Sequence, residues 1–155
     1  MQYTMADLEN FIRRNYRLDG NVQISIEPYA YELAFTTLAS GDTQTGTIQI
    51  QANADLVLTS PRFRCVQDST DAALRDVVPE IKLLLTDSGS QQQLMNTGVD
   101  ISTYFGQIGR APYDLMYPRI ISGRSAMVIQ AQNYGTVTYE RLELTFAGVL
   151  VKGFV

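Results

Sequence analysis

From residue 21 onward, nearly every apolar stretch of the chain is short and ends at Gly, Pro, Asn or Asp. Within these stretches apolar and polar residues alternate, which is typical of β-strands because successive side chains point to opposite faces of a sheet. The breaker residues mark turns between the strands. This pattern constrains most of the chain to an antiparallel β fold and excludes the interleaved helices of a parallel α/β sheet.

About eight strands are expected from this pattern. They are placed at residues 22–26, 32–38, 45–51, 55–65, 77–87, 91–95, 125–132 and 139–151. Pro28 is expected to end the first strand, and Pro61 to bend or interrupt the fourth, because proline cannot donate to a central ladder. In residues 77–87, Ile81 and its alternate neighbours should face the core, while Leu84 points the other way and needs cover of its own, which another chain could provide. Residues 96–124 form a long irregular section with one or two short strands.

The number and spacing of the strands predict an all-β, antiparallel β-sandwich. Strand connectivity does not follow from the pattern, so a jelly roll and an immunoglobulin-like sandwich stay equal on the residues alone. Residues 21–155 are assigned to the sandwich, and residues 1–20 to a short N-terminal helix or arm.

The helix is expected at residues 4–14, where Thr4 can cap it together with Asp7. Leu8, Phe11 and Ile12 share one of its faces. Two arrangements are open: the segment reaches a neighbouring subunit as an arm, or it packs across its own sandwich.

The composition argues against enzyme chemistry. The chain of 155 residues has no histidine, which removes the commonest general base and the commonest metal ligand. It contains no nucleotide-binding, calcium-binding or zinc-binding motif. Its one cysteine, Cys65, is expected to be a buried structural thiol. We therefore expect no catalytic activity and no cofactor.

Charge and hydropathy restrict the partners. The net charge of −4 argues against a protein that binds nucleic acid through broad phosphate neutralisation. No apolar run reaches the 18 residues or more of a membrane-spanning helix. The first residues lack the features of a secretory signal, so residence without export is expected. Neither a nucleic-acid partner nor a membrane partner is predicted.

The candidate functional residues are tyrosine, phenylalanine and arginine side chains, which are common anchors of protein interfaces. Most lie in the irregular section, namely Tyr104, Phe105, Arg110, Tyr113, Tyr117 and Arg119, and two lie in the N-terminal segment, Phe11 and Arg13. The interface hypothesis is that the loop 110–119 and one sandwich face contact a partner. Two alternatives stand beside it: the aromatic rings close one end of the sandwich, or they stack on sugar rings as in a carbohydrate-binding module.

Several stretches resemble small virion proteins of tailed bacteriophages. The first are TIQIQANADL at 47–56, LLTDSGS at 84–90 and QLMN at 93–96. Further matches follow in the same order: Phe105-Gly106, Pro112, YPRI at 117–120, Asn133-Tyr134 and LTFAG at 144–148. The resemblance covers residues 44–155, and residues 1–43 do not match.

This resemblance implies a jelly-roll capsid cement or decoration protein. Such a protein is made in the cytoplasm of the bacterial host and sits on the outer capsid surface of the virion. There it binds the major capsid protein as a homo-oligomer, a dimer or a trimer. A tail or head-fibre component is the alternative, and a carbohydrate-binding β-sandwich module is the second alternative.

Overall fold

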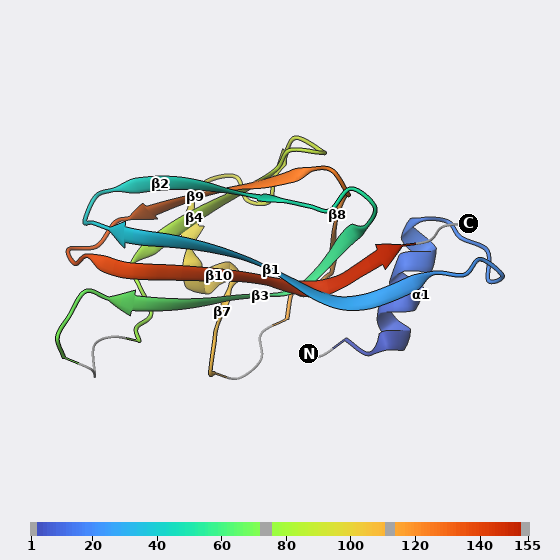
Figure 1. Ribbon diagram of the computed structural model, residues 1–155, viewed down its shortest axis with the longest axis horizontal. Helices are drawn as coiled ribbons and strands as arrows, with labels where there is room; N and C mark the ends of the chain where they lie inside the picture. Colours follow the sequence, from blue (N-terminus) through green and yellow to red (C-terminus); the bar gives the residue numbers. More distant parts are fainter. Residues whose placement is uncertain (1–2, 72–75, 111–113, 153–155) are drawn as a thin grey trace.

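The computed structural model describes residues 3–71, 76–110 and 114–152. Two β-sheets pack face to face, and a helix lies at one end of them (Figure 1). The predicted all-β sandwich with one short N-terminal helix is confirmed.

Sheet A has the strand order β1-β10-β3-β7, with β8 also paired to β3, and sheet B has the order β2-β9-β4-β5, with β6 also paired to β4. The strands of sheet A are β1 (Ser25–Leu38), β3 (Asp55–Gln67), β7 (Gly106–Gln107), β8 (Arg119–Ile121) and β10 (Tyr139–Lys152). The strands of sheet B are β2 (Thr43–Gln49), β4 (Ile81–Asp87), β5 (Gln92–Gln93), β6 (Val99–Asp100) and β9 (Ala126–Asn133). All pairs are antiparallel except β3 with β7. The helices are α1 (Met5–Asn15) and α2 (Ile101–Tyr104).

The two prolines do not break strands as expected. Only residues 25–26 of the first predicted strand are in a strand, and they join the predicted strand 32–38 in the single strand β1, which runs through Pro28. β1 is the edge strand of sheet A, and an edge strand tolerates proline because half of its backbone N–H groups have no ladder partner. β3 likewise continues through Pro61. Its register with β10 shifts just before that residue, around Thr59, so the expected irregularity is a local bulge and not an interruption.

The core lies between the two sheets. Ile81, Leu83 and Leu85 are buried there, as the alternation of residues 77–87 predicts. Leu84 is half-buried on the outer face of sheet B. Each alternating strand thus supplies one row of apolar side chains to the core. Burial of their apolar surface stabilises the fold by about 25 cal/mol per Å² of area removed from water.

Cys65 is part of this core and is fully buried. Burial, and then the nearby charge of Asp76, raises the pKa of its thiol to about 12, so the reactive thiolate is nearly absent at neutral pH. We expect a thiol reagent to leave Cys65 unmodified in the folded protein and to modify it fully in denaturant. Equal reaction rates in both conditions would contradict this placement.

The helix α1 packs across its own sandwich, which decides between the two arrangements left open by the sequence. Its capping box between Thr4 and Asp7 is present as predicted. Leu8 and Ile12 are buried against the outer face of sheet A, in a cluster with Val57, Val149 and Val151. Figure 1 shows α1 beside the end of β10.

Two tyrosine hydroxyls fasten the N-terminal segment further. Tyr3 donates to the carbonyl oxygen of Leu115. Tyr16 donates to the carboxylate of Asp55, whose other oxygen accepts from the backbone N–H of Gly123 at 2.6 Å. Burial, and then the bond to Asp55, raises the pKa of Tyr16, so the hydroxyl keeps its proton. The segment is therefore tied to the sandwich by both polar and apolar contacts.

Candidate functional site

Four of the predicted site residues line one cleft. This α1 cleft has a volume of about 650 Å³ and includes Phe11, Tyr104, Tyr117 and Arg119. Its other walls come from α1, the turn after β4, β5 and the segment leading into β8. The N-terminal helix and the irregular section, far apart in the sequence, thus form one surface feature.

The segment before β8 presents two exposed apolar side chains on an anchored backbone. Leu115 is buried, its N–H donates to the carbonyl oxygen of Thr59 at 2.8 Å, and its own carbonyl oxygen accepts from Tyr3. Directly after it, Met116 is 97% exposed and Tyr117 is 64% exposed. Exposed apolar side chains on a backbone held in this way are typical of docking surfaces, because the backbone does not have to be ordered when a partner covers them.

The ring of Tyr117 also contacts α1. Its centroid lies 5.2 Å from that of Phe11, with the rings at 75° to one another. This edge-to-face geometry is the favoured one for aromatic pairs. Tyr117 is therefore held in place by the helix while one side of it stays open to solvent.

Arg119 supplies a cation to the cleft. Its Nη2 donates to the side-chain oxygen of Gln92 at 3.3 Å, and its Nε is buried without a hydrogen-bond partner among the described residues. The carboxylate of Asp87, which also lines the cleft, instead accepts from the N–H of Gly89 and the hydroxyl of Ser90, both at 2.9 Å. The guanidinium of Arg119 is thus suited to donate a charge-assisted hydrogen bond to a partner's oxygen.

The structure places the other predicted residues elsewhere. Phe105 is a core residue, 2% exposed, with its ring centroid 5.5 Å from that of Phe146, so it is not at the surface where an interface residue must lie. Arg110 is exposed but does not line the cleft. Tyr113 lies outside the described residues.

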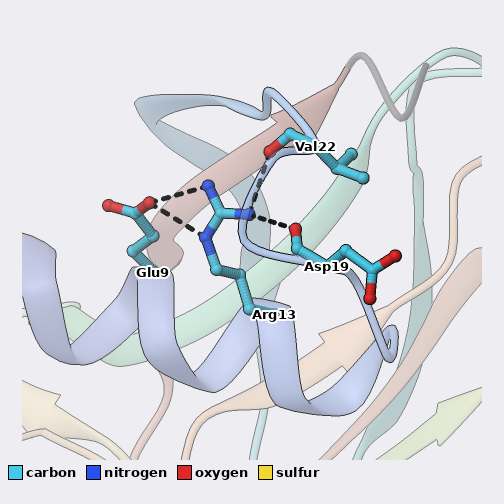
Figure 2. A network of polar contacts seen from close by, with 4 residues as sticks. All are labelled: Glu9, Arg13, Asp19 and Val22. Atoms are coloured by element: carbon cyan, nitrogen blue, oxygen red, sulfur yellow. Dashed lines mark hydrogen bonds and ion pairs between the residues drawn. The ribbon is translucent and has the colours of Figure 1, made fainter.

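Arg13 is engaged within the chain. Its guanidinium pairs with Glu9 through Nη2 at 2.9 Å, and its Nη1 donates to the carbonyl oxygens of Asp19 and Val22 at 3.1 and 2.9 Å (Figure 2). These contacts join the last turns of α1 to the loop that leads into β1. The guanidinium of Arg13 therefore binds the chain's own loop. The sequence alone instead suggests Arg13 as a contact to a partner protein.

We expect Arg13→Met to loosen this loop. The substitution keeps much of the side-chain length but removes the bonds to Asp19 and Val22, which should lower the free energy of unfolding by about 1 kcal/mol. Amide exchange of residues 17–24 should become faster. Arg14→Met removes a neighbouring exposed charge and is the matched control; equal effects of the two substitutions would contradict the assigned role.

Some lining residues of the cleft were not predicted. Met116 follows Leu115 in a short apolar run before Pro118, and this run is a sequence signal that could have identified Met116 as a candidate interface residue. Asn15 and Gln92 carry no such signal, because they enter the cleft only through the packing of α1 and β5.

Among the described residues, no group of three or more His, Cys, Asp or Glu side chains is placed to hold a metal ion. Within the same part of the chain, neither helix is long and apolar enough to cross a membrane.

No protein-family model matches the chain, and comparisons with curated proteins and with solved structures gave no match either. The likeness of residues 44–155 to phage virion proteins therefore stays a prediction.

Proposed function

We propose that this protein is a structural component of a tailed-bacteriophage virion, without catalytic activity, that binds and stabilises the outer capsid shell. The observation that carries the proposal is the exposed pair Met116 and Tyr117 on an anchored backbone beside Arg119. An apolar pair flanked by an arginine matches the composition of energetically important interface residues. The major capsid protein is the proposed partner.

The arrangement of the strands supports the jelly-roll part of this proposal. β1, β10, β3 and β8 lie in one sheet, and β2, β9, β4 and β5 in the other. The chain changes sheet at every step from β1 to β4, again between β6 and β7, and at both steps from β8 to β10. Two interleaved Greek keys produce crossings of this kind.

A capsid role also suits the small size of the proposed contact surface around Met116, Tyr117 and Arg119. A few anchors give a single copy only weak affinity. On a capsid lattice, however, a linked set of copies gains avidity from simultaneous contacts. A tail or head-fibre component would use the same surface, and the copy number per particle separates these placements.

The α1 cleft also favours a second candidate, a carbohydrate-binding module. Phe11 and Tyr117 supply ring faces, and Asn15 and Gln92 supply amides, which together are suited to a sugar. Binding of a glycan that is lost in a Tyr117→Ala variant would favour this candidate, since the capsid proposal requires no sugar.

The capsid proposal is tested with purified shells that lack this protein. We expect the double substitution Met116→Ser and Tyr117→Ser to weaken binding to the shells at least about tenfold, because it removes the apolar anchors. Val78→Ser, at a 55% exposed valine that does not line the cleft, is the control and should bind normally. Unchanged binding of the double variant would refute the assigned surface.

A further inference from the structure

Asp19 and Gly20 form the one Asp-Gly pair of the chain, and no asparagine precedes a glycine in it. The pair lies in the loop between α1 and β1, and both residues are exposed. The N–H of Val22 donates to the carbonyl oxygen of Asp19 at 3.1 Å, which closes a β-turn with Gly20 at its second position. Glycine has no Cβ, so its backbone nitrogen is unusually open to the side chain of the residue before it.

The two groups that could react in this pair are not engaged elsewhere. Within the described ranges, the carboxylate of Asp19 takes part in no hydrogen bond or ion pair, and the N–H of Gly20 donates to no acceptor. The carboxylate points away from the guanidinium of Arg13 (Figure 2). A Cβ built on Gly20 meets no atom within 4 Å, so the turn has room for the side chain of Asp19 to reach the backbone nitrogen of Gly20.

The backbone carbonyl of Asp19, in contrast, is held by two donors. Its oxygen accepts from Nη1 of Arg13 and from the N–H of Val22, both at 3.1 Å. Two donors on one carbonyl oxygen stabilise the negative charge that develops there when a nucleophile attacks the carbon, as an oxyanion hole does. The bond from Arg13 is the stronger of the two because its donor is charged.

We propose that Asp19 is a self-modification site, which isomerises to isoaspartate through a succinimide, and that Arg13 directs the product. The nitrogen of Gly20 bonds to the side-chain carboxyl carbon of Asp19, and a carboxyl oxygen leaves as water with the amide proton and the carboxyl proton. Water then opens the five-membered ring. Its attack at the side-chain carbonyl restores aspartate, whereas attack at the backbone carbonyl, which Arg13 activates, gives isoaspartate. One water is released and one is consumed, so no other reactant is needed.

The product carries its charge beside Arg13. In isoaspartate the chain runs through the former side-chain carbon, and the former backbone carbonyl becomes a free carboxylate. This carboxylate forms where the guanidinium already donates, so an ion pair replaces a bond to a neutral oxygen. The lengthened backbone lies in the segment that joins β1 to α1, the helix that supplies Phe11 and Asn15 to the α1 cleft.

Incubation of the folded full chain in water labelled with the heavy oxygen isotope tests this inference, with peptides analysed by chromatography and mass spectrometry. Each ring opening places one heavy oxygen in the residue that forms. We expect labelled isoaspartate at position 19, and at least about tenfold less label at Asp42, an exposed aspartate that precedes the β-branched Thr43. Gly20→Ala should reduce the label at Asp19 at least about fivefold, because its methyl group hinders attack by the nitrogen.

The ratio of labelled isoaspartate to labelled aspartate tests the role of Arg13, because this ratio does not depend on how fast the ring forms. Arg13→Met should lower the ratio at least about threefold, since the charged donor to the attacked carbonyl is lost. Arg14→Met, at the exposed neighbouring position, should leave it unchanged. Label at Asp19 no higher than at Asp42 overturns the inference. So does an equal ratio in the two arginine variants, and the capsid proposal depends on neither result.

Discussion

Gly148→Ala is expected to lower the free energy of unfolding by about 4 kcal/mol. A Cβ at position 148 would lie 2.0 Å from the carbonyl oxygen of Val57 and 3.1 Å from the Cα of Leu58. Both atoms belong to the backbone of β3, so no side-chain rotation relieves the clash. Strands β10 and β3 would have to separate in the middle of sheet A, where their register shifts.

Gly20→Ala is the matched control, because a Cβ at that position meets no atom within 4 Å. Denaturant unfolding of the two variants should therefore give very different midpoints. Gly148→Ala unfolding at the wild-type midpoint would show that β10 and β3 are not packed as described.

Asn133→Ala is expected to lower the free energy of unfolding by about 3 kcal/mol. The side chain is fully buried and joins three segments. Its Nδ2 donates to the carbonyl oxygens of Leu38 and Val137 at 3.0 and 2.7 Å, and its Oδ1 accepts from the N–H of Gly135 at 2.9 Å. Alanine would leave these buried groups without partners where β1 ends and the β9–β10 turn begins.

Asn10→Ala makes the same substitution at an exposed position of α1 and should change stability little. Thermal unfolding with both variants measures the difference. A loss for Asn133→Ala no larger than that for Asn10→Ala would mean that the buried network does not hold the turn.

Much of the fold follows from local pattern. The alternation around Ile81 and Leu83 identifies their strand and its buried face, and the spacing of Thr4 and Asp7 identifies the start of α1. Both are short-range features, since one depends on the period of a strand and the other on a single helical turn. Pro28 was misjudged because its effect depends on whether β1 is an edge strand, which is a long-range property.

The candidate site was predictable only in part. Tyr117 and Arg119 could be selected by residue type, and the structure brings them together with Phe11 across the cleft. Phe105 has the same aromatic character but faces the core, and the irregular spacing of its segment gives no period from which to assign its face. Arg13 donates hydrogen bonds to backbone carbonyl groups of the loop that follows α1. The positions of these carbonyl groups depend on the path of the backbone, which cannot be predicted from residue type.

The capsid proposal is tested most directly by the copy number of this chain in purified phage particles, measured by quantitative mass spectrometry against the major capsid protein. We predict roughly one-half to one copy per capsid subunit, since a cement protein must occupy a repeated site of the lattice. A handful of copies per particle would move the protein to the tail or a vertex. Its complete absence from particles would contradict the proposed function.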